Sequence, residues 1–150
     1  MIALKEIDHR NWQECIKLKV KKEQEHFVPS NLYSLVQAKY QNTEYYSFVP
    51  FASYLDETMV GFIMWDDVPN NGVYVIPRLM IDEQYQGKGI AKRVLQTAID
   101  IIKQKKDCKG IQVSYEPDNV AAQRLYASLG FKRNELKSKT DGPVVELKIK

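Results

Sequence analysis

The N-terminal third of the chain changes from a short extended pattern to helical spacing. Residues Ile2–Ile7 form a brief apolar segment, and apolar residues then recur about every four positions, which predicts a helix over Arg10–Lys22. A second helix is predicted to follow Pro29 and Ser30, because serine is a favoured N-cap residue. The positions that mark the faces of the two helices are Trp12, Ile16, Val20, Leu32, Leu35, Val36 and Lys39.

The middle of the chain is rich in β-branched and aromatic residues, which predicts strands. Tyr45–Leu55 and Met59–Asp67 are separated by a short polar turn and indicate a β-hairpin. Pro50 predicts a bulge or an edge position in the first of these strands. After a turn that contains two asparagines and a glycine, Val73–Asp82 indicates another strand, with an interruption at Pro77.

A strongly amphipathic helix is predicted to begin at Ile90 and to end within residues 107–110. Its apolar stripe consists of Ile90, Val94, Leu95, Ala98, Ile101 and Ile102. The segment that follows, Ile111–Tyr115, is short and mostly apolar, as expected of a strand that is buried on both faces.

One more helix and two short strands complete the pattern. The helix is predicted to stop at Gly130 and to bury one face, which carries Ala122, Leu125, Tyr126 and Leu129. Phe131–Lys137 and Val144–Lys150 indicate closing strands around a Gly-Pro turn. The order β-α-α-β-β-β-α-β-α-β-β predicts an α/β fold, with a mixed, mostly antiparallel central sheet flanked by helices. With no repeat or linker in the sequence, we expect residues 1–150 to form one domain.

Composition narrows the possible functions only a little. The chain is 44% hydrophobic and 27% charged and carries a formal net charge of +3, without a basic stripe interleaved with aromatics, so nucleic acid is not an expected partner. No signal peptide or membrane-length apolar run is present, and we expect a cytoplasmic protein that does not bind membranes. Cys15 and Cys108 lack a CxxC neighbour, and His9 and His26 lack partners at ligand spacing, so we expect neither a disulfide nor a metal site.

The turn before the Ile90 helix combines glycines with positive charges. A helix N-terminus exposes unpaired N–H groups, and Gly87 and Gly89 let a phosphate approach the backbone. Lys88, Lys92 and Arg93 add charge, although they fit a solvated face equally well. The pattern is neither GxGxxG nor a P-loop. From these residues alone, an anion site and a plain strand–turn–helix connection are about equally favoured.

Two motifs resemble one known family. The sequence QGKGIA, Gln86–Ala91, matches the Q/R-x-x-G-x-G/A signature of the GNAT superfamily of acyl-CoA N-acetyltransferases. Asn119–Phe131 is similar to the N-x-x-A-x-x-L-Y-x-x-x-G-F segment that follows the next strand in that family. The resemblance covers about Met59 to Lys150 and implies a GNAT fold and acetyl-CoA as co-substrate, with no metal.

The resemblance also implies a set of cofactor contacts. Backbone amides of the glycine turn would hold the pyrophosphate of coenzyme A, the preceding strand would bind the pantetheine arm, and an N–H near Ile81 would polarise the thioester carbonyl. Asn119 could cap its helix, contact coenzyme A, or do both. The residues expected to bind the cofactor are Leu79, Met80, Ile81, Gln86, Gly87, Lys88, Gly89, Ile90, Ala91 and Asn119.

Tyr126 is the expected catalytic residue. Its spacing alone indicates a core tyrosine, but it occupies the family's tyrosine position, which implies a general acid for the departing thiolate. The attacking amine must be neutral, because an ammonium has no lone pair. The sequence does not identify the base that removes its proton.

The acceptor is expected to be a small-molecule amine. Glu23–Tyr40 resembles the acceptor-side region of bacterial spermine/spermidine N-acetyltransferases, which implies a polyamine, with Glu23, Glu25 and Asp82 as candidate contacts. The positive net charge argues mildly against a cationic substrate. Another amine (an aminoglycoside, a protein N-terminus or lysine, or an amino acid) and a catalytically silent acyl-CoA-binding module are the alternatives. Exposed C-terminal strands suggest a homodimer.

Overall fold

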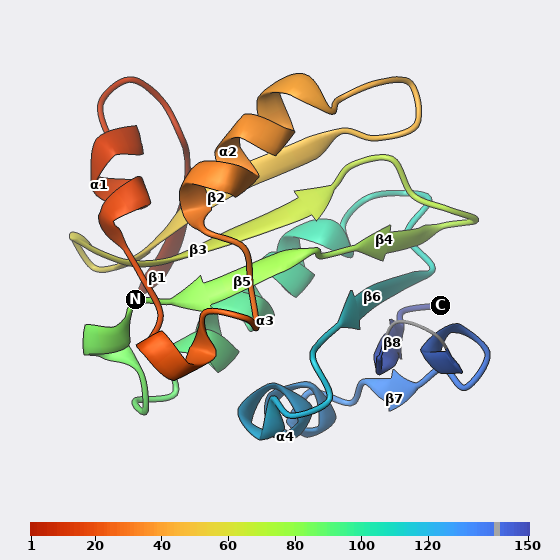
Figure 1. The fold of residues 1–150 in the computed structure, drawn as a ribbon. Coiled ribbons are helices and arrows are strands. Elements are labelled where there is room, and N and C mark those ends of the chain that lie inside the picture. The colour runs from red at the N-terminus through yellow and green to blue at the C-terminus, as the bar shows by residue number, and fades with distance from the viewer. Residues whose placement is uncertain (140–141) are drawn as a thin grey trace.

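The computed structural model describes residues 1–139 and 142–150, and its first sheet is entirely antiparallel. The strands β1 (Ile2–Glu6), β2 (Phe48–Leu55), β3 (Thr58–Asp66) and β5 (Arg78–Ile81) lie in the order β1-β2-β3-β5 (Figure 1). The predicted hairpin is confirmed as the β2–β3 pair. Strand β2 is an interior strand, but Pro50 lies just beyond its last residue pair with β1 and is paired only with Met64 of β3, and the register shift falls at Ser53/Tyr54.

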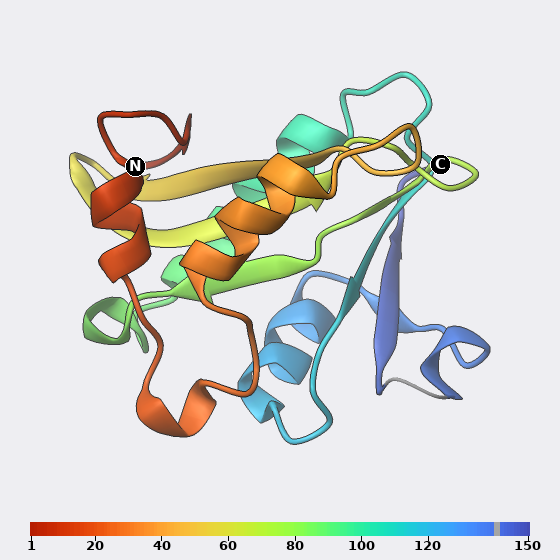
Figure 2. The ribbon, with the colours of Figure 1, turned by 45° about the horizontal axis from the view of Figure 1, so that its top comes forward.

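The second sheet contains the remaining strands, β4 (Val73–Val75), β6 (Gly110–Ser114), β7 (Lys132–Arg133) and β8 (Val144–Lys148). Their order is β4-β6-β8-β7, and only the β4–β6 pair is parallel. The mostly antiparallel α/β architecture is thus confirmed, with the sheet divided into two halves that diverge from one another (Figure 2).

The division occurs at Ile76 and Pro77. The predicted single strand Val73–Asp82 is in fact two strands, because β4 pairs with β6 whereas β5 pairs with β3. Ile76 still donates its N–H to the Gln112 carbonyl at 3.0 Å, but Pro77 has no N–H with which to continue the ladder. The interruption expected from Pro77 is therefore the point where the two sheets separate.

Four α-helices cover the sheets. Helices α1 (Trp12–Lys17) and α2 (Asn31–Tyr40) pack on one face of the first sheet, and α3 (Ile90–Ile102) packs on the other (Figure 2). Helix α4 (Val120–Ser128) lies beside β6. Short 3-10 helices are η1 (Lys22–Gln24), η2 (Glu83–Tyr85) and η3 (Lys137–Lys139).

Local capping signals were accurate. The Ser30 hydroxyl accepts a hydrogen bond from the Tyr33 N–H at 3.1 Å, and the Asn119 Oδ1 atom accepts one from the Ala122 N–H at the same distance. Gly130 has a φ of 91° and follows α4, as predicted. Helices α2 and α4 therefore begin, and α4 ends, where the sequence indicated.

The predicted core was mostly correct. The larger core cluster surrounds α3, and a smaller one lies under α1 and α2. Ile101 is 43% exposed, because it lies at the edge of the apolar stripe in the last turn of α3, and Ile99 is buried instead. On α2, Leu32 and Val36 face solvent; the buried positions are Asn31, Ser34 and Ala38.

Three of the predicted elements are shorter than expected. The first helix ends at Lys17 because Leu18 is extended and the Lys19 N–H donates to Asp82 Oδ1 at 2.9 Å. The strand predicted over Phe131–Lys137 is limited to β7, because the Asn134 side chain accepts a hydrogen bond from the Lys137 N–H and forms a turn. Helix α3 also ends at Ile102, before the predicted residues 107–110.

Candidate active site

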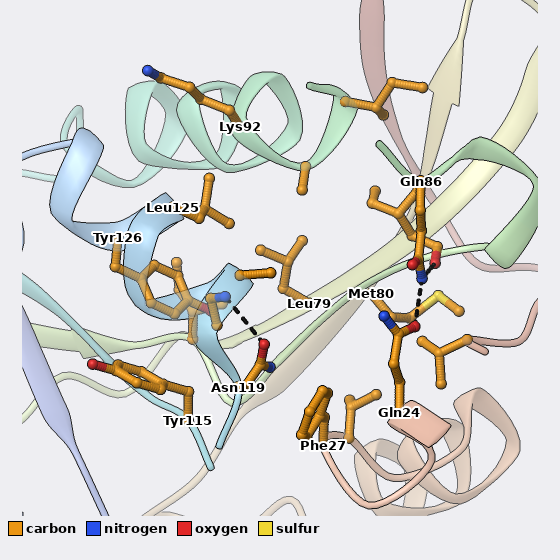
Figure 3. A pocket seen from close by; sticks show the side chains of 18 of the residues that line it. Gln24, Phe27, Leu79, Met80, Gln86, Lys92, Tyr115, Asn119, Leu125 and Tyr126 are labelled. Carbon is orange, nitrogen blue, oxygen red and sulfur yellow. Dashed lines mark hydrogen bonds between the residues drawn. The ribbon is translucent and has the colours of Figure 1, made fainter. Parts of the chain in front are cut away.

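A cleft opens where the two sheets diverge, with a volume of about 420 Å³. This volume is within the range of roughly 300–1,000 Å³ that is usual for small-molecule sites. The cleft is bordered by β5, the glycine turn, the start of α3, the end of β6 and helix α4 (Figure 3). The expected site residues that line it are Leu79, Met80, Ile81, Gln86, Gly87, Gly89, Ile90, Ala91, Asn119 and Tyr126.

Strand β5 presents a free edge to this cleft. Asp82 donates its N–H to the Val60 carbonyl of β3 at 2.8 Å. Because N–H groups alternate in direction along an antiparallel strand, those of Leu79 and Ile81 point away from β3. Among the described residues no strand pairs with that edge. An extended ligand that contains amides can add to it as a strand would.

The glycine turn has the backbone conformation and the space that an anion needs. Gly87 and Gly89 have φ values of 77° and 74°, in the left-handed region that favours glycine. A Cβ atom at either position would meet no atom within 4 Å, so the turn faces open space. Gly89 also precedes α3, whose first N–H groups lack partners within the helix. The turn therefore fits a diphosphate.

The two lysines of this region differ in position. Lys92, in the first turn of α3, lines the cleft. Lys88 does not line it, and its Nζ atom lies 5.9 Å from the centre of the Tyr85 ring. Of these two lysines, Lys92 alone contributes to the lining of the cleft, and its side chain extends from α3 away from Leu79 and Tyr126 (Figure 3).

The segment Leu18–Pro29, called the strap below, forms a further wall of the cleft. It is irregular except for η1, and it contributes Val20, Gln24, Phe27 and Val28 to the lining. The Gln86 Nε2 atom donates hydrogen bonds to Gln24 Oε1 at 2.9 Å and to the Ile81 carbonyl at 3.0 Å (Figure 3). The strap is thus bonded to the first residue of the Gln86–Ala91 motif.

Tyr126 lies against Tyr115 and Phe131 on the α4 side of the cleft. Its ring centroid is 5.7 Å from that of Tyr115 and 5.6 Å from that of Phe131. Burial, and to a smaller extent the nearby Tyr115, raises the pKa of Tyr126 to about 12. Within the part of the chain that the structure describes, its hydroxyl has no hydrogen-bond partner. At neutral pH this hydroxyl is a protonated donor that is available to a ligand.

The acidic residues expected at the acceptor are not gathered in the cleft. Asp82 is buried, and its two oxygens accept hydrogen bonds from the Lys19 N–H at 2.9 Å and the Gln84 N–H at 3.1 Å. It does not line the cleft, so its position gives no support to an acceptor contact, and its two bonds hold the backbone of the residues around it. Glu23, on η1, lines neither of the two cavities described here, whereas Glu25 lines the second.

The second cavity, of about 260 Å³, lies next to the cleft between the strap and the start of α2. It shares Val20, Val28 and Met80 with the cleft. Asn31 also lines it; this side chain is 3% exposed, and its Nδ2 atom donates to the Cys15 carbonyl at 2.9 Å. In residues 1–139 and 142–150 no donor bonds to its Oδ1 atom, which can accept a hydrogen bond from a ligand.

Several cleft residues were not found from the sequence. Gln24, Phe27 and Val28 lie in the Glu23–Tyr40 segment that resembles an acceptor-side region, but they were not among the expected contacts, because the segment is irregular here and its spacing does not show which side chains face the cleft. Tyr115, in contrast, is the last residue of a predicted strand and lies four residues before the second motif, and its position at a strand end could have identified it.

Within residues 1–139 and 142–150, no group of three or more His, Cys, Asp or Glu side chains is arranged to hold a metal ion. No helix in these ranges is long and apolar enough to cross a bilayer.

Comparison with known proteins identifies the family. A model of the acetyltransferase (GNAT) family matches residues 4–131. Spermine/spermidine N(1)-acetyltransferase of Bacillus subtilis is 32% identical over 139 residues, which cover 89% of each chain. Aminoglycoside N(6')-acetyltransferase type 1 of Klebsiella pneumoniae is 27% identical over 81 residues, which cover 54% of this chain and 40% of that protein.

The fold is also found among solved structures. That of aminoglycoside acetyltransferase AAC(6')-Ib in complex with coenzyme A has a TM-score of 0.77 and 16% identity, and the alignment covers 99% of this chain and 95% of that one. The chain belongs to the GNAT acetyltransferase family and is an N-acetyltransferase that uses acetyl-CoA.

Proposed function

We propose that this N-acetyltransferase transfers the acetyl group to a primary amine of a polyamine such as spermine or spermidine. The supporting observation is that the similarity to the Bacillus subtilis polyamine enzyme extends over 89% of both chains, whereas the aminoglycoside relatives match only about half of this chain. In a chain of this length, a match of that extent includes much of the N-terminal region, in which the strap and α2 border the second cavity.

The cofactor is proposed to lie along the free edge of β5 and to end at the glycine turn. The N–H groups of Leu79 and Ile81 would bond to the amides of the pantetheine arm or to the thioester carbonyl. The amides of the turn and of the first residues of α3 would hold the diphosphate, together with Lys92. Asn119 caps α4 and lines the same cleft, so both of its expected roles are compatible with its position.

The chemistry requires a neutral amine, a polarised carbonyl and a stabilised leaving group. Acetyl-CoA supplies the thioester. The N–H of Ile81 is proposed to polarise its carbonyl, and the Tyr126 hydroxyl to donate a hydrogen bond to the sulfur as negative charge develops there. A phenol with a pKa of about 12 is a weaker acid than a thiol, whose pKa is about 8.5. Hydrogen-bond donation is therefore favoured over complete proton transfer to the thiolate.

The second cavity offers a place for the rest of an extended amine. A chain that leaves the cleft past Met80 would meet the Glu25 carboxylate and the Asn31 Oδ1 atom, which both accept hydrogen bonds from an ammonium group. Apolar contacts with Val20 and Val28 suit the methylene groups between the nitrogens. Glu25 is accordingly the acidic residue that we retain as an acceptor contact.

Specificity constants for spermine, spermidine, a simple monoamine, a peptide amine and an aminoglycoside, measured at two ionic strengths, test the acceptor. We expect the polyamines to exceed the monoamine about tenfold, and expect this preference to weaken as salt screens the charges. Glu25→Gln should raise the KM for spermine several-fold and leave that for the monoamine nearly unchanged. Glu23→Gln, two residues away and outside both cavities, is the matched control.

Other results would change the assignment. If an aminoglycoside or a peptide amine has a higher specificity constant than both polyamines, the proposed polyamine acceptor is wrong. Binding of coenzyme A without turnover of any amine in the panel would favour the silent acyl-CoA-binding module.

We also propose a cytoplasmic location. Cys15 and Cys108 are both buried free thiols, as is usual in a reducing compartment. Fractionation of cells that produce the protein from its own gene, with immunodetection in each fraction, tests this proposal, and recovery in a secreted fraction would contradict it.

A further inference from the structure

The strap is bonded to the cofactor side of the cleft through a short chain of hydrogen bonds. Gln24 Oε1 accepts from the Lys21 N–H at 3.1 Å and from Gln86 Nε2 at 2.9 Å. Gln86 Nε2 donates in addition to the carbonyl of Ile81 at 3.0 Å. One amide group thus joins the strap, the glycine turn and the free-edge strand β5.

The two ends of this chain of bonds belong to different walls of the cleft. Ile81 has its carbonyl bonded to Gln86, and its N–H faces the cleft. Gln86 opens the turn that is proposed to hold the diphosphate. Gln24 belongs to the strap, whose Phe27 and Val28 side chains line the same cleft (Figure 3). The glutamine pair therefore connects the cofactor side with the wall on the acceptor side.

A second contact joins the strap to the opposite border of the cleft. His26 Nε2 lies 2.8 Å from Asp118 Oδ2, in the loop before α4. Both side chains are more than half exposed, so water and salt weaken this contact. The Gln24–Gln86 bond is partly buried and is less affected by them.

Few other interactions hold the strap in place. Beyond the three-residue η1, a turn over residues 25–27 adds a backbone hydrogen bond from the Phe27 N–H to the Gln24 carbonyl at 2.9 Å, and the rest of the strap is irregular. Its first residues are fixed, because Lys19 bonds to Asp82 and its carbonyl accepts the Glu83 N–H at 2.8 Å. From Lys21 to Pro29, closure over the cleft depends on Gln24, on the exposed His26 contact and on apolar side chains.

We propose that Gln24 is a positioning residue that couples cofactor binding to closure of the strap. A cofactor that orders the glycine turn orders Gln86, which then holds Gln24 and the strap in the closed position. By linkage, a closed strap strengthens cofactor binding by the same factor. This inference rests on the proposed cofactor site at Gln86–Ala91.

Hydrogen exchange with and without coenzyme A tests the coupling. In the wild type, coenzyme A should protect the backbone amides of the glycine turn and also those of residues 21–29. In Gln24→Met, which has similar length but no hydrogen-bonding atom, we expect protection of the turn to persist and that of residues 21–29 to fall at least several-fold. The dissociation constant for coenzyme A, measured by calorimetry, should rise about three- to tenfold, as expected for the loss of one partly buried hydrogen bond.

Conservative and double variants separate positioning from general destabilisation. Gln24→Glu keeps an oxygen that accepts from Gln86 and Lys21, so it should restore most of the strap protection and cofactor affinity. Gln24→Met/Gln86→Met should bind coenzyme A no more weakly than Gln86→Met alone, because the two side chains act through one bond. Thermal melting shows whether each variant is folded.

The failures of the two proposals can be distinguished. If coenzyme A binds the wild type and protects the turn, but protects residues 21–29 equally in Gln24→Met, the coupling role of Gln24 is wrong. If coenzyme A does not protect the turn in the wild type, the proposed cofactor site itself is wrong.

Discussion

Tyr126 shows how its surroundings change the chemistry of a single side chain. Removing its hydroxyl while keeping the ring should preserve the contacts with Tyr115 and Phe131. We expect Tyr126→Phe to lower kcat about 100-fold, a usual effect for a positioned proton or hydrogen-bond donor, with little change in the KM for acetyl-CoA. Steady-state kinetics of the two proteins provide the measurement. Equal kcat values for the two proteins would mean that Tyr126 is a core residue that takes no part in catalysis.

The raised pKa of Tyr126 determines the pH range in which this donor is available. The neutral phenol is the donating form, and a pKa of about 12 keeps it neutral well above pH 10. Ionisation of Tyr126 should therefore cause no loss of kcat below about pH 11. A tyrosine of ordinary pKa, about 10, would produce a decline one to two pH units earlier. Comparing the pH profiles of the wild type and Tyr126→Phe isolates this contribution from those of other groups.

At the scale of elements, the glycine turn and the first turn of α3 form one unit. Gly89→Val places a β-branched residue at a φ of 74° and adds a side chain to the open surface that is proposed to face the diphosphate. We expect the KM for acetyl-CoA to rise at least tenfold. Lys88→Ala, in the same turn but outside the cleft, should change this KM much less. Unchanged cofactor affinity in a folded Gly89→Val protein would contradict the assignment.

The same scale shows where sequence reasoning succeeds. The glycine turn, the caps of α2 and α4 and the stop at Gly130 depend on the conformational preferences of one or two residues, so the sequence predicts them directly. The strap was wrongly assigned to a helix as far as Lys22, because apolar spacing reports which side chains are buried and not how the backbone bonds. The bond that ends this helix joins Lys19 to Asp82, which is 63 residues away in the chain.

The partners of Asp82 were not predictable for a related reason. The sequence suggested Asp82 as an acceptor contact because it is an acid close to the glycine motif. In the structure its carboxylate accepts two backbone N–H groups, one of them from the strap. A single sequence gives no sign of that distant partner.

At the scale of the whole molecule, the end of the second sheet is incomplete. Strand β7 pairs only with Val145 and Glu146 of β8, so the other residues of β8 have no strand on that side within the described part of the chain. We propose that a second copy of the chain covers this edge and forms a homodimer. Light scattering coupled to size-exclusion chromatography should give twice the chain mass of 17.4 kDa. A mass equal to one chain across a range of concentrations would exclude the dimer.

The break at Pro77 has a consequence for handling the protein. It leaves β5 with an unpaired edge inside the molecule, and such an edge can template pairing with a strand of another molecule. A ligand that occupies this edge would therefore also block strand pairing between molecules and so reduce aggregation. Preparations kept with coenzyme A should stay clear for longer on storage than those kept without it.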